Sequence, residues 1–105
     1  MEQKFLHLKP TKSFMANKPS DIIFSDIAFS FFCKWMRQNP LLFDKIETLI
    51  KDCLRNPFNG LGKPEPLKGN YQGCWSRRIN QEHRLIYFMN AEGLHIISCR
   101  NHYDD

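Results

Sequence analysis

The sequence predicts an α+β domain in which two N-terminal antiparallel helices pack on one face of an antiparallel sheet of four to five strands. The first half contains two stretches whose apolar residues recur with helical spacing, and the second half alternates apolar and polar residues between turn signals. With 105 residues, 42% hydrophobic and 25% charged, the chain suits one globular domain, and it excludes two independent cores or overall disorder.

The first twenty residues differ from the rest of the chain. They contain four lysines and two prolines without a stable periodicity, so we expect residues 1–20 to be a disordered extension before a single domain over 21–105. No apolar run approaches the roughly 18 residues that cross a bilayer, and the N-terminus lacks the apolar core of a signal peptide. We therefore expect a soluble, cytoplasmic protein that contacts no membrane.

The first expected elements are a short strand and a helix. Residues 22–24 form an apolar run that favours a buried strand, and Ser25 follows as a suitable helix N-cap. A helix is predicted over residues 26–38, because large apolar side chains recur at every fourth position from Ile27 to Trp35.

A second helix is expected immediately afterwards. The pair Asn39-Pro40 ends the first helix, and proline suits the first position of the next one, where its missing amide hydrogen has no partner to lose. Six apolar residues then follow at i, i+4, i+7, i+8, i+11 and i+12, namely Leu42, Ile46, Leu49, Ile50, Cys53 and Leu54. The short connecting turn predicts that the two helices pair antiparallel.

The remaining residues favour a tight loop followed by antiparallel strands. Residues 59–70 hold three of the five glycines and two prolines. Beyond them we expect three strands and two turns, with strands at 75–79, 83–89 and 94–100 and turns at 80–82 and 90–93. Because the helices cover one face of this sheet, the other face is available for a ligand.

Strand alternation suggests a basic cluster on the uncovered face. The even-numbered side carries Ser76, Arg78, Arg84, Ile86, Phe88, Ile96, Ser98 and Arg100, and His102 continues the series. The odd-numbered side, expected to face the helices, carries Leu85, Tyr87, Met89, Ile97 and Cys99. This register puts Ile86, Phe88 and Ile96 on the polar face, so alternation alone does not establish the cluster.

The positive charge is concentrated in the second half of the chain. Fifteen basic residues against eleven acidic ones give +4, and residues 55–103 alone hold seven basic and three acidic residues. Five of those seven are arginines, whose planar guanidinium groups suit phosphate oxygens. A polyanionic partner and a merely solvated basic face are supported about equally by charge alone.

The cysteines and histidines do not indicate a metal site. The four cysteines form no Cys-x-x-Cys pair, and the four histidines form no His-x-x-x-His group. We interpret the cysteines as small hydrophobic residues and expect neither a metal nor another cofactor.

Four motifs in this small domain carry a resemblance to a known family. They are the segments 62–68 (GKPEPLK), 75–79 (WSRRI), 82–87 (EHRLIY) and 99–103 (CRNHY). Their residues, order and spacing resemble the YoeB/Txe branch of the RelE-like toxins of bacterial toxin–antitoxin modules, over about residues 22–103. The resemblance implies a ribosome-dependent messenger-RNA endonuclease that enters the decoding site and cuts the codon there.

The resemblance also implies site residues and partners. The family's acid/base carboxylate falls on Glu65, its arginine at the scissile phosphate on Arg84, its general acid on His102, and the following aromatic residue on Tyr103. The predicted RNA-binding residues are Lys63, Lys68, Arg77, Arg78 and Arg100. The implied partners are messenger RNA and the 70S ribosome, a YefM/Axe-like antitoxin with an extended acidic segment, and a second copy of the chain.

The predicted residues also suit the reaction chemically. RNA supplies its own nucleophile in the 2′-hydroxyl, so a base, an acid and cations at the phosphate suffice without a metal. Glu65 is flanked by Lys63 and Lys68, which favour its charged form and the approach of RNA. His102 can carry a proton near neutral pH and donate it to the leaving 5′ oxygen.

The end of the chain suggests an alternative. In the family the His-Tyr pair ordinarily ends the protein, whereas here Asp104 and Asp105 follow and add negative charge beside a phosphate site. The second hypothesis is therefore a catalytically weakened module that binds RNA or antitoxin through the same basic face. Cleavage of messenger RNA by the wild type but not by Glu65 or His102 variants distinguishes the two hypotheses.

Overall fold

The computed structural model describes residues 21–101. The extension expected over 1–20 and the predicted site residues His102 and Tyr103 lie outside the described residues. Within this range the elements follow the order β1 (Ile22–Phe24), α2 (Asp26–Gln38), α3 (Pro40–Arg55), β2 (Glu65–Pro66), the short 3₁₀ helix η2 (Gly69–Tyr71), β3 (Trp75–Arg78), β4 (Arg84–Asn90) and β5 (Gly93–Ser98).

The two helices begin and end where their capping residues predict. The Ser25 hydroxyl accepts a hydrogen bond from the amide of Ala28 at 3.1 Å and so caps α2. The side chain of Asn39 accepts one from the amide of Leu42 at 3.2 Å and caps α3, which begins with proline at its first position. Asn39 also ends α2, because its own amide donates to the carbonyl of Trp35 at 2.7 Å.

The sheet has five strands in the order β1-β5-β4-β3-β2. Neighbours from β2 to β5 pair antiparallel, as predicted, whereas β1 pairs parallel to β5, so the sheet is mixed. The strand β2 lies inside the segment expected to be a loop, with Glu65 opposite Ser76 and Pro66 opposite Trp75. A proline is compatible with this strand because β2 forms the edge of the sheet.

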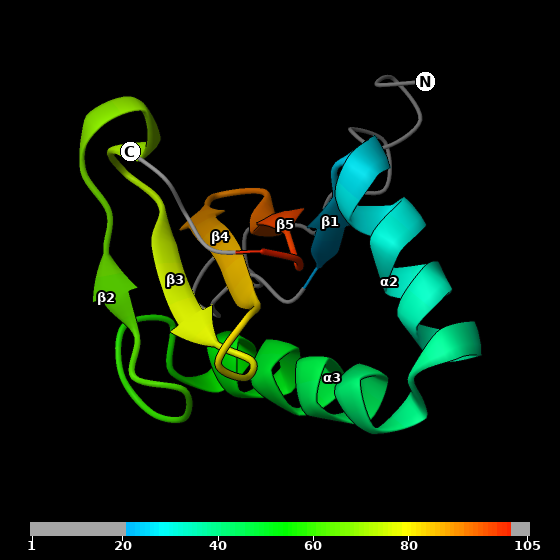
Figure 1. Ribbon diagram of the computed structural model, residues 1–105. Coiled ribbons are helices and arrows are strands. Elements are labelled where there is room, and N and C mark those ends of the chain that lie inside the picture. The colour runs from blue at the N-terminus through cyan, green and yellow to red at the C-terminus, as the bar shows by residue number, and fades with distance from the viewer. Residues whose placement is uncertain (1–20, 102–105) are drawn as a thin grey trace, which may run out of the picture.

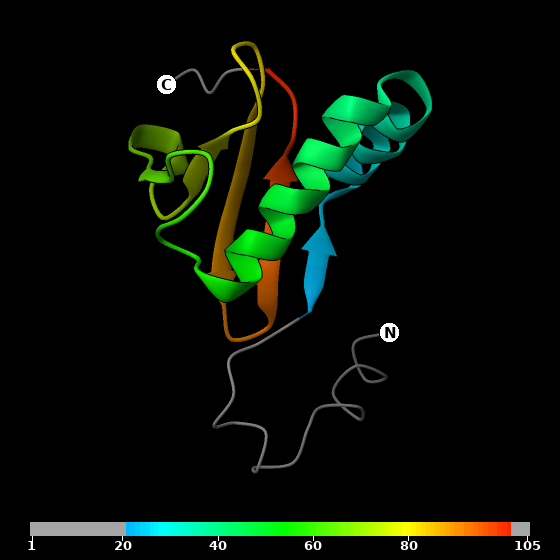
Figure 2. The ribbon, with the colours of Figure 1, turned by 90° about the horizontal axis from the view of Figure 1, so that it is seen from below.

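Both helices pack on one face of the sheet, as the sequence predicts. Helix α3 runs beneath the strands in Figure 1 and crosses in front of β4 and β5 in Figure 2. Helix α2 stands beside β1 and contacts β5. The helices meet at Asn39 and contact one another, with the ring centroids of Phe32 in α2 and Phe43 in α3 4.7 Å apart.

A β-bulge corrects the expected alternation in the last strand. Tyr87 pairs with Ile96 and Ile86 with Ser98, so Ile97 is an extra residue in β5. Ile96 is therefore fully buried in the core, contrary to the prediction, and Ile97 lies outside the core. Because the bulge reverses the alternation, Cys99 faces the helices as predicted, and the polar face does not carry Ile96.

The core fills the space between the helices and the sheet. Its fully buried aliphatic and aromatic members include Ile46 and Leu49 from α3, Leu85 and Tyr87 from β4, and Leu94 from β5. Burying a large apolar side chain of this kind stabilises the fold by about 1.5–3 kcal/mol. None of the helices within residues 21–101 combines the length and the apolar character that a membrane span needs.

Candidate active site on the second face of the sheet

Side chains that alternate away from the helices form what we call the second face of the sheet. On this face Glu65 lies opposite Ser76, which lies opposite Ile86. The next pair along the same strands is Arg78 opposite Arg84. Because opposite residues have Cβ atoms about 4.5–5.5 Å apart, the carboxylate and the two guanidinium groups gather on three neighbouring strands.

The carboxylate of Glu65 stands at an exposed edge between two lysines. Lys63 precedes it, and Lys68 follows it as the N-cap residue of η2; all three residues are exposed. The amide of Arg78 donates to the carbonyl of Gly62 at 2.7 Å, which extends the contact between the β2 segment and β3. Glu65 and both lysines therefore lie on one exposed segment at the edge of the sheet.

Arg84 is the first residue of β4, and one nitrogen of its guanidinium group is hydrogen-bonded to the preceding turn. Its Nη1 donates to the carbonyls of Asn80 at 2.7 Å and His83 at 3.1 Å, in the turn between β3 and β4. Within residues 21–101, Nε and Nη2 donate to no partner, so these nitrogens can bind a phosphate. A guanidinium group fixed by its own turn is preorganised for an anion.

The end of the described chain is attached to the same place. The amide of Arg84 donates to the carbonyl of Asn101 at 3.1 Å, and the amide of Asn101 donates to His83 Nδ1 at 2.7 Å. Asn101 has a φ of 59°, a left-handed conformation that asparagine tolerates better than most residues. These bonds fix the point from which His102 follows in the chain.

The roles of His83 and Asn101 were not predicted from the sequence. His83 is buried, and its ring centroid lies 5.0 Å from that of Trp35. Both residues fall within motifs that carry the family resemblance. Their spacing alone does not indicate that they meet, because His83 precedes β4 and Asn101 follows β5, 18 residues later in the chain.

Arg77 does not belong to the RNA-binding set that the sequence predicts, because it is fully buried. Its Nη1 lies 2.6 Å from Asp52 Oδ2 in α3, and its Nε donates to the hydroxyl of Tyr87 at 3.1 Å. Its position in β3 follows the side of the strand that faces the helices. The guanidinium group therefore has a structural role and is inaccessible to a phosphate.

The buried Arg77 fastens the loop that leads to β2. Its guanidinium nitrogens donate to the backbone carbonyls of Asn56, Asn59 and Leu61. The amide of Leu61 donates to Asp52 at 2.9 Å; this bond and the Arg77 guanidinium hold the pKa of Asp52 below its ordinary value. The loop is thereby tied to α3 just before the segment that carries Glu65.

Arg100 is separated from the other basic residues by its packing. Its guanidinium carbon lies 4.2 Å from the centroid of the Phe31 ring in α2, a cation–π contact. Arg100 lines a pocket with Ile97 and Ser98 and with Tyr71 from η2. This pocket places η2 over the second face, on the side of the sheet opposite α3 in Figure 1.

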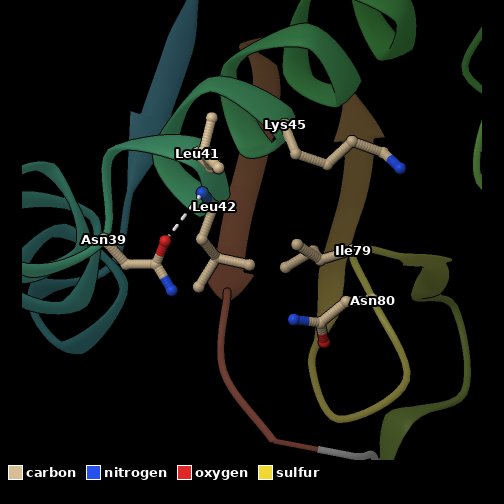
Figure 3. A pocket seen from close by; sticks show the side chains of 6 residues that line it. All are labelled: Asn39, Leu41, Leu42, Lys45, Ile79 and Asn80. Carbon is tan, nitrogen blue, oxygen red and sulfur yellow. Dashed lines mark hydrogen bonds between the residues drawn. The ribbon is translucent and has the colours of Figure 1, made fainter.

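A second pocket lies away from the predicted site residues. It is formed where the start of α3 approaches the turn after β3 (Figure 3), and its lining residues are Asn39, Leu41, Leu42, Lys45, Ile79 and Asn80. Leu41 is 81% exposed and the pocket holds no carboxylate or imidazole. It offers none of the groups needed for acid/base chemistry.

Thiol and metal chemistry have little support among residues 21–101. Burial raises the pKa of Cys53 to about 11 and that of Cys99 to about 12, so both thiols stay protonated at neutral pH. No three histidine, cysteine or acidic residues in this part of the chain are grouped as metal ligands would be. The second face offers the carboxylate of Glu65 and the guanidinium groups of Arg78 and Arg84.

Comparison with known proteins gives a consistent result. Residues 24–103 match the family model described as the YoeB-like toxin of bacterial type II toxin–antitoxin systems. Among curated relatives, Toxin YoeB of Escherichia coli strain K12 is 46% identical over 82 residues, which cover 78% of this chain and 98% of that protein.

Solved structures of similar proteins have the same fold. The YoeB-YefM complex from Staphylococcus aureus matches with a TM-score of 0.75 and 42% identity, over 80% of this chain and 98% of that chain. The YoeB dimer from Staphylococcus aureus matches with a TM-score of 0.75 and 41% identity over the same shares.

Proposed function

The chain belongs to the family of YoeB-like toxins of bacterial type II toxin–antitoxin systems, and on that premise we propose that it is an endonuclease that cuts messenger RNA on the ribosome. The proposed reaction is attack of the 2′-hydroxyl on the adjacent phosphate without a metal. The products are a 2′,3′-cyclic phosphate and a 5′-hydroxyl.

One observation carries this proposal. The register of β2, β3 and β4 gathers Glu65, Arg78 and Arg84 on the face of the sheet that the helices leave uncovered. The backbone of Asn101, the residue before His102 in the sequence, is bonded to Arg84 and to His83. A base, two cations and an acid are the groups that cleavage of RNA by its own hydroxyl requires.

Glu65 acts as the general base in this proposal. Its carboxylate removes the proton from the 2′-hydroxyl, and the resulting oxygen forms a bond to phosphorus while the bond to the 5′ oxygen breaks. The exposed position of Glu65 on an edge strand leaves room for an extended RNA strand to approach it. Lys63 and Lys68 attract the RNA backbone toward this edge.

Arg84 and Arg78 stabilise the charge that develops on the phosphoryl oxygens. Arg84 is held by its turn through Nη1, so its other nitrogens are oriented before the substrate arrives. A preorganised donor of this kind typically contributes about 3 kcal/mol to transition-state stabilisation, which is about 10²–10³ in kcat. Arg78 is exposed and adds positive charge on the neighbouring strand.

His102 completes the reaction as the general acid by donating a proton to the leaving 5′ oxygen. Tyr103 stacks on a base of the bound codon, as exposed aromatic side chains on RNA-binding surfaces commonly do. Arg100 lies at the margin of the same face and contacts a more distant phosphate.

We further propose a protein partner, a YefM-like antitoxin. A Staphylococcus aureus relative that is 42% identical to this chain occurs in a YoeB-YefM complex. An acidic antitoxin segment laid over the second face would neutralise Arg78, Arg84 and the two lysines and exclude RNA by occupying its site. Pairing with a second copy is proposed on the same basis, since the related dimer has the same fold.

The test of the proposed function is cleavage of messenger RNA by the full-length protein in a reconstituted translation system. Mapping the 5′ ends of the fragments should show cuts within the codon on the ribosome, and Glu65→Gln and His102→Gln should each abolish them. Binding to ribosomes by sedimentation should persist in both variants, because each substitution keeps the size of the side chain.

The matched control is Glu47→Gln, which removes a half-exposed carboxylate that pairs with Lys51 on α3, the helix on the opposite side of the sheet. This variant should cleave like the wild type. If the wild type binds ribosomes but leaves the RNA intact, as its Glu65 and His102 variants do, the protein is a binding module and the nuclease proposal is wrong.

A further inference from the structure

The imidazole of His83 occupies a position that the proposed reaction does not yet use. It is buried between α2 and the turn before β4, next to Arg84 in sequence, and it contacts the last described residue of the chain. A buried imidazole with a short, directed hydrogen bond is a candidate for a specific role.

The hydrogen bond defines the state of the ring. The Asn101 amide can only donate, so Nδ1 must accept and must lack a proton, which leaves the ring hydrogen on Nε2. Nε2 lies 3.7 Å from Glu82 Oε1, on the side away from Asn101. The bond to Asn101 therefore requires neutral His83 in one tautomer.

The surroundings of this ring hold it in place. The ring is tilted against the indole of Trp35 with centroids 5.0 Å apart, and the indole Nε1 donates to the carbonyl of Cys99 at 3.1 Å. The backbone of His83 is fixed as well, because its amide donates to the side chain of Asn80 at 2.7 Å. The acceptor Nδ1 is thus rigidly supported by α2 and by the turn.

The chain after β5 is bonded at successive points by these groups. Trp35 holds Cys99, His83 holds the amide of Asn101, and Arg84 holds its carbonyl. Asn101 bends the chain through its left-handed φ of 59° immediately before His102. The bond to His83 sets the direction in which the chain leaves β5.

We propose that His83 is a positioning residue, which anchors the backbone of Asn101 through neutral Nδ1 and thereby places the general acid for the leaving oxygen. This inference rests on the proposed function, since it assigns the acid to His102. A misplacement of about 1 Å in a catalytic group can cost about 10²-fold in rate, so the anchor affects turnover. The anchoring bond uses the ring of His83, whereas Arg84 is held by the backbone carbonyls of His83 and Asn80, which a change of the His83 side chain leaves in place.

The test compares two variants of His83. His83→Asn puts a carbonyl oxygen near the place of Nδ1 and keeps an acceptor, whereas His83→Phe keeps a ring against Trp35 and removes the acceptor. Cleavage by each variant is measured at several concentrations of ribosomes stalled on a defined codon, which separates kcat from KM.

We expect His83→Phe to lower kcat by about 10- to 100-fold with KM within about twofold of the wild type. His83→Asn should restore most of kcat. Unchanged kcat in His83→Phe, or equal losses in both variants, would overturn the positioning role, because neither result would depend on the acceptor.

A second measurement does not require cleavage. Hydrogen–deuterium exchange at the Asn101 amide should be slow in the wild type and in His83→Asn, and faster by about tenfold or more in His83→Phe. Exchange that is equally fast in all three proteins would show that the anchor does not form. The exchange measurement reports on the hydrogen bond to Asn101 even if the proteins cut no RNA. Failure of the anchor and failure of the proposed function are therefore distinguishable.

A third measurement uses the unaltered protein. ¹⁵N spectra of histidine-labelled wild type should show His83 with an unprotonated Nδ1 and a proton on Nε2 at neutral pH. A ring protonated at Nδ1 cannot accept the Asn101 amide, so that spectrum would overturn the proposal even if both variants failed to fold.

Discussion

Arg77 and Arg78 are neighbours in β3, yet the fold gives them opposite environments. Arg77 is fully buried against Asp52 and Tyr87 on the helix-covered side, whereas Arg78 is exposed on the second face opposite Arg84. The guanidinium group of Arg77 stabilises the fold, whereas that of Arg78 is an exposed cation. Counting basic residues therefore overstates the surface that can bind a phosphate.

The two arginines show that the two sides of β3 have separate roles. The second face supplies the charges, and the buried cluster of Arg77, Asp52 and Tyr87 holds the loop that leads to Glu65. Stability and activity should therefore respond separately to changes on the two sides of one strand. Substitutions on the two sides of β3 test that separation.

The largest effect is expected from Arg77→Met. Losing this guanidinium group removes the buried partner of Asp52, which keeps only the Leu61 amide and the exposed Arg55, and it removes the donor to three loop carbonyls. Breaking a buried ion pair in this way costs about 3–5 kcal/mol in the free energy of unfolding. Urea denaturation measures it, with Arg78→Met as the control on the same strand. Equal stabilities of the two variants would contradict the comparison.

Acid should weaken the buried cluster next. The pKa of Asp52 is lowered from its ordinary 3.8 by the Leu61 amide and by Arg77. A depressed pKa contributes stability that is fully present above the ordinary value and is lost as the pH falls through the folded-state value. We expect the unfolding free energy to fall more steeply below about pH 4 in the wild type than in Asp52→Asn. Parallel curves would mean that Asp52 is not coupled to folding.

Tyr87→Phe should have a smaller effect on the same cluster. The Tyr87 hydroxyl donates to the carbonyl of Pro57 at 2.7 Å and accepts from Arg77, so its removal should cost about 1–3 kcal/mol. Burial raises the pKa of Tyr87 from 10 to about 12, so its contribution is present below pH 10 and is lost as the pH rises toward 12.

The dependence of stability on pH above 10 tests the role of the Tyr87 hydroxyl separately. Stability of the wild type measured between pH 10 and 12 should decline relative to Tyr87→Phe, in which the titrating hydroxyl is absent. A constant difference between the two proteins over this range would refute the coupling of Tyr87 to the fold.

The smallest effect on stability is expected from Arg78→Met. This exposed substitution should change the unfolding free energy by no more than about 0.5 kcal/mol. It should instead weaken binding to ribosomes and reduce the slope of log affinity against log salt by about 1, because one phosphate contact is lost. An unchanged salt slope would place Arg78 outside the RNA-binding surface.

The regular elements could be predicted from the sequence because local signals specify them. Ser25, Asn39 and Pro40 set the bounds of α2 and α3, and the apolar spacing of α3 identifies the residues that it buries. Four of the five strands, β1, β3, β4 and β5, were also predicted within two residues at each end. The family resemblance, carried by four motifs, supplied the roles of the site residues, and those roles stay predictions.

The features that sequence reasoning missed depend on contacts between distant segments. The short strand β2 has no periodicity of its own and exists because Glu65 and Pro66 pair with β3. The bulge at Ile97 reverses the alternation of β5, and a single extra residue has no signature in the sequence. The burial of Arg77 could have been predicted, because Arg77 is an odd-numbered strand residue and the odd-numbered side was expected to face the helices.

The parallel pairing of β1 with β5 joins the two ends of the described chain. Ile22 lies opposite Leu94, and the amide of Ser25 donates to the carbonyl of Ile96 at 3.0 Å. During synthesis β1 emerges first and has no partner until the final strand leaves the ribosome. The sheet therefore closes only after nearly all of the described chain has been made, and the edge of β5 stays unpaired on that side until β1 docks.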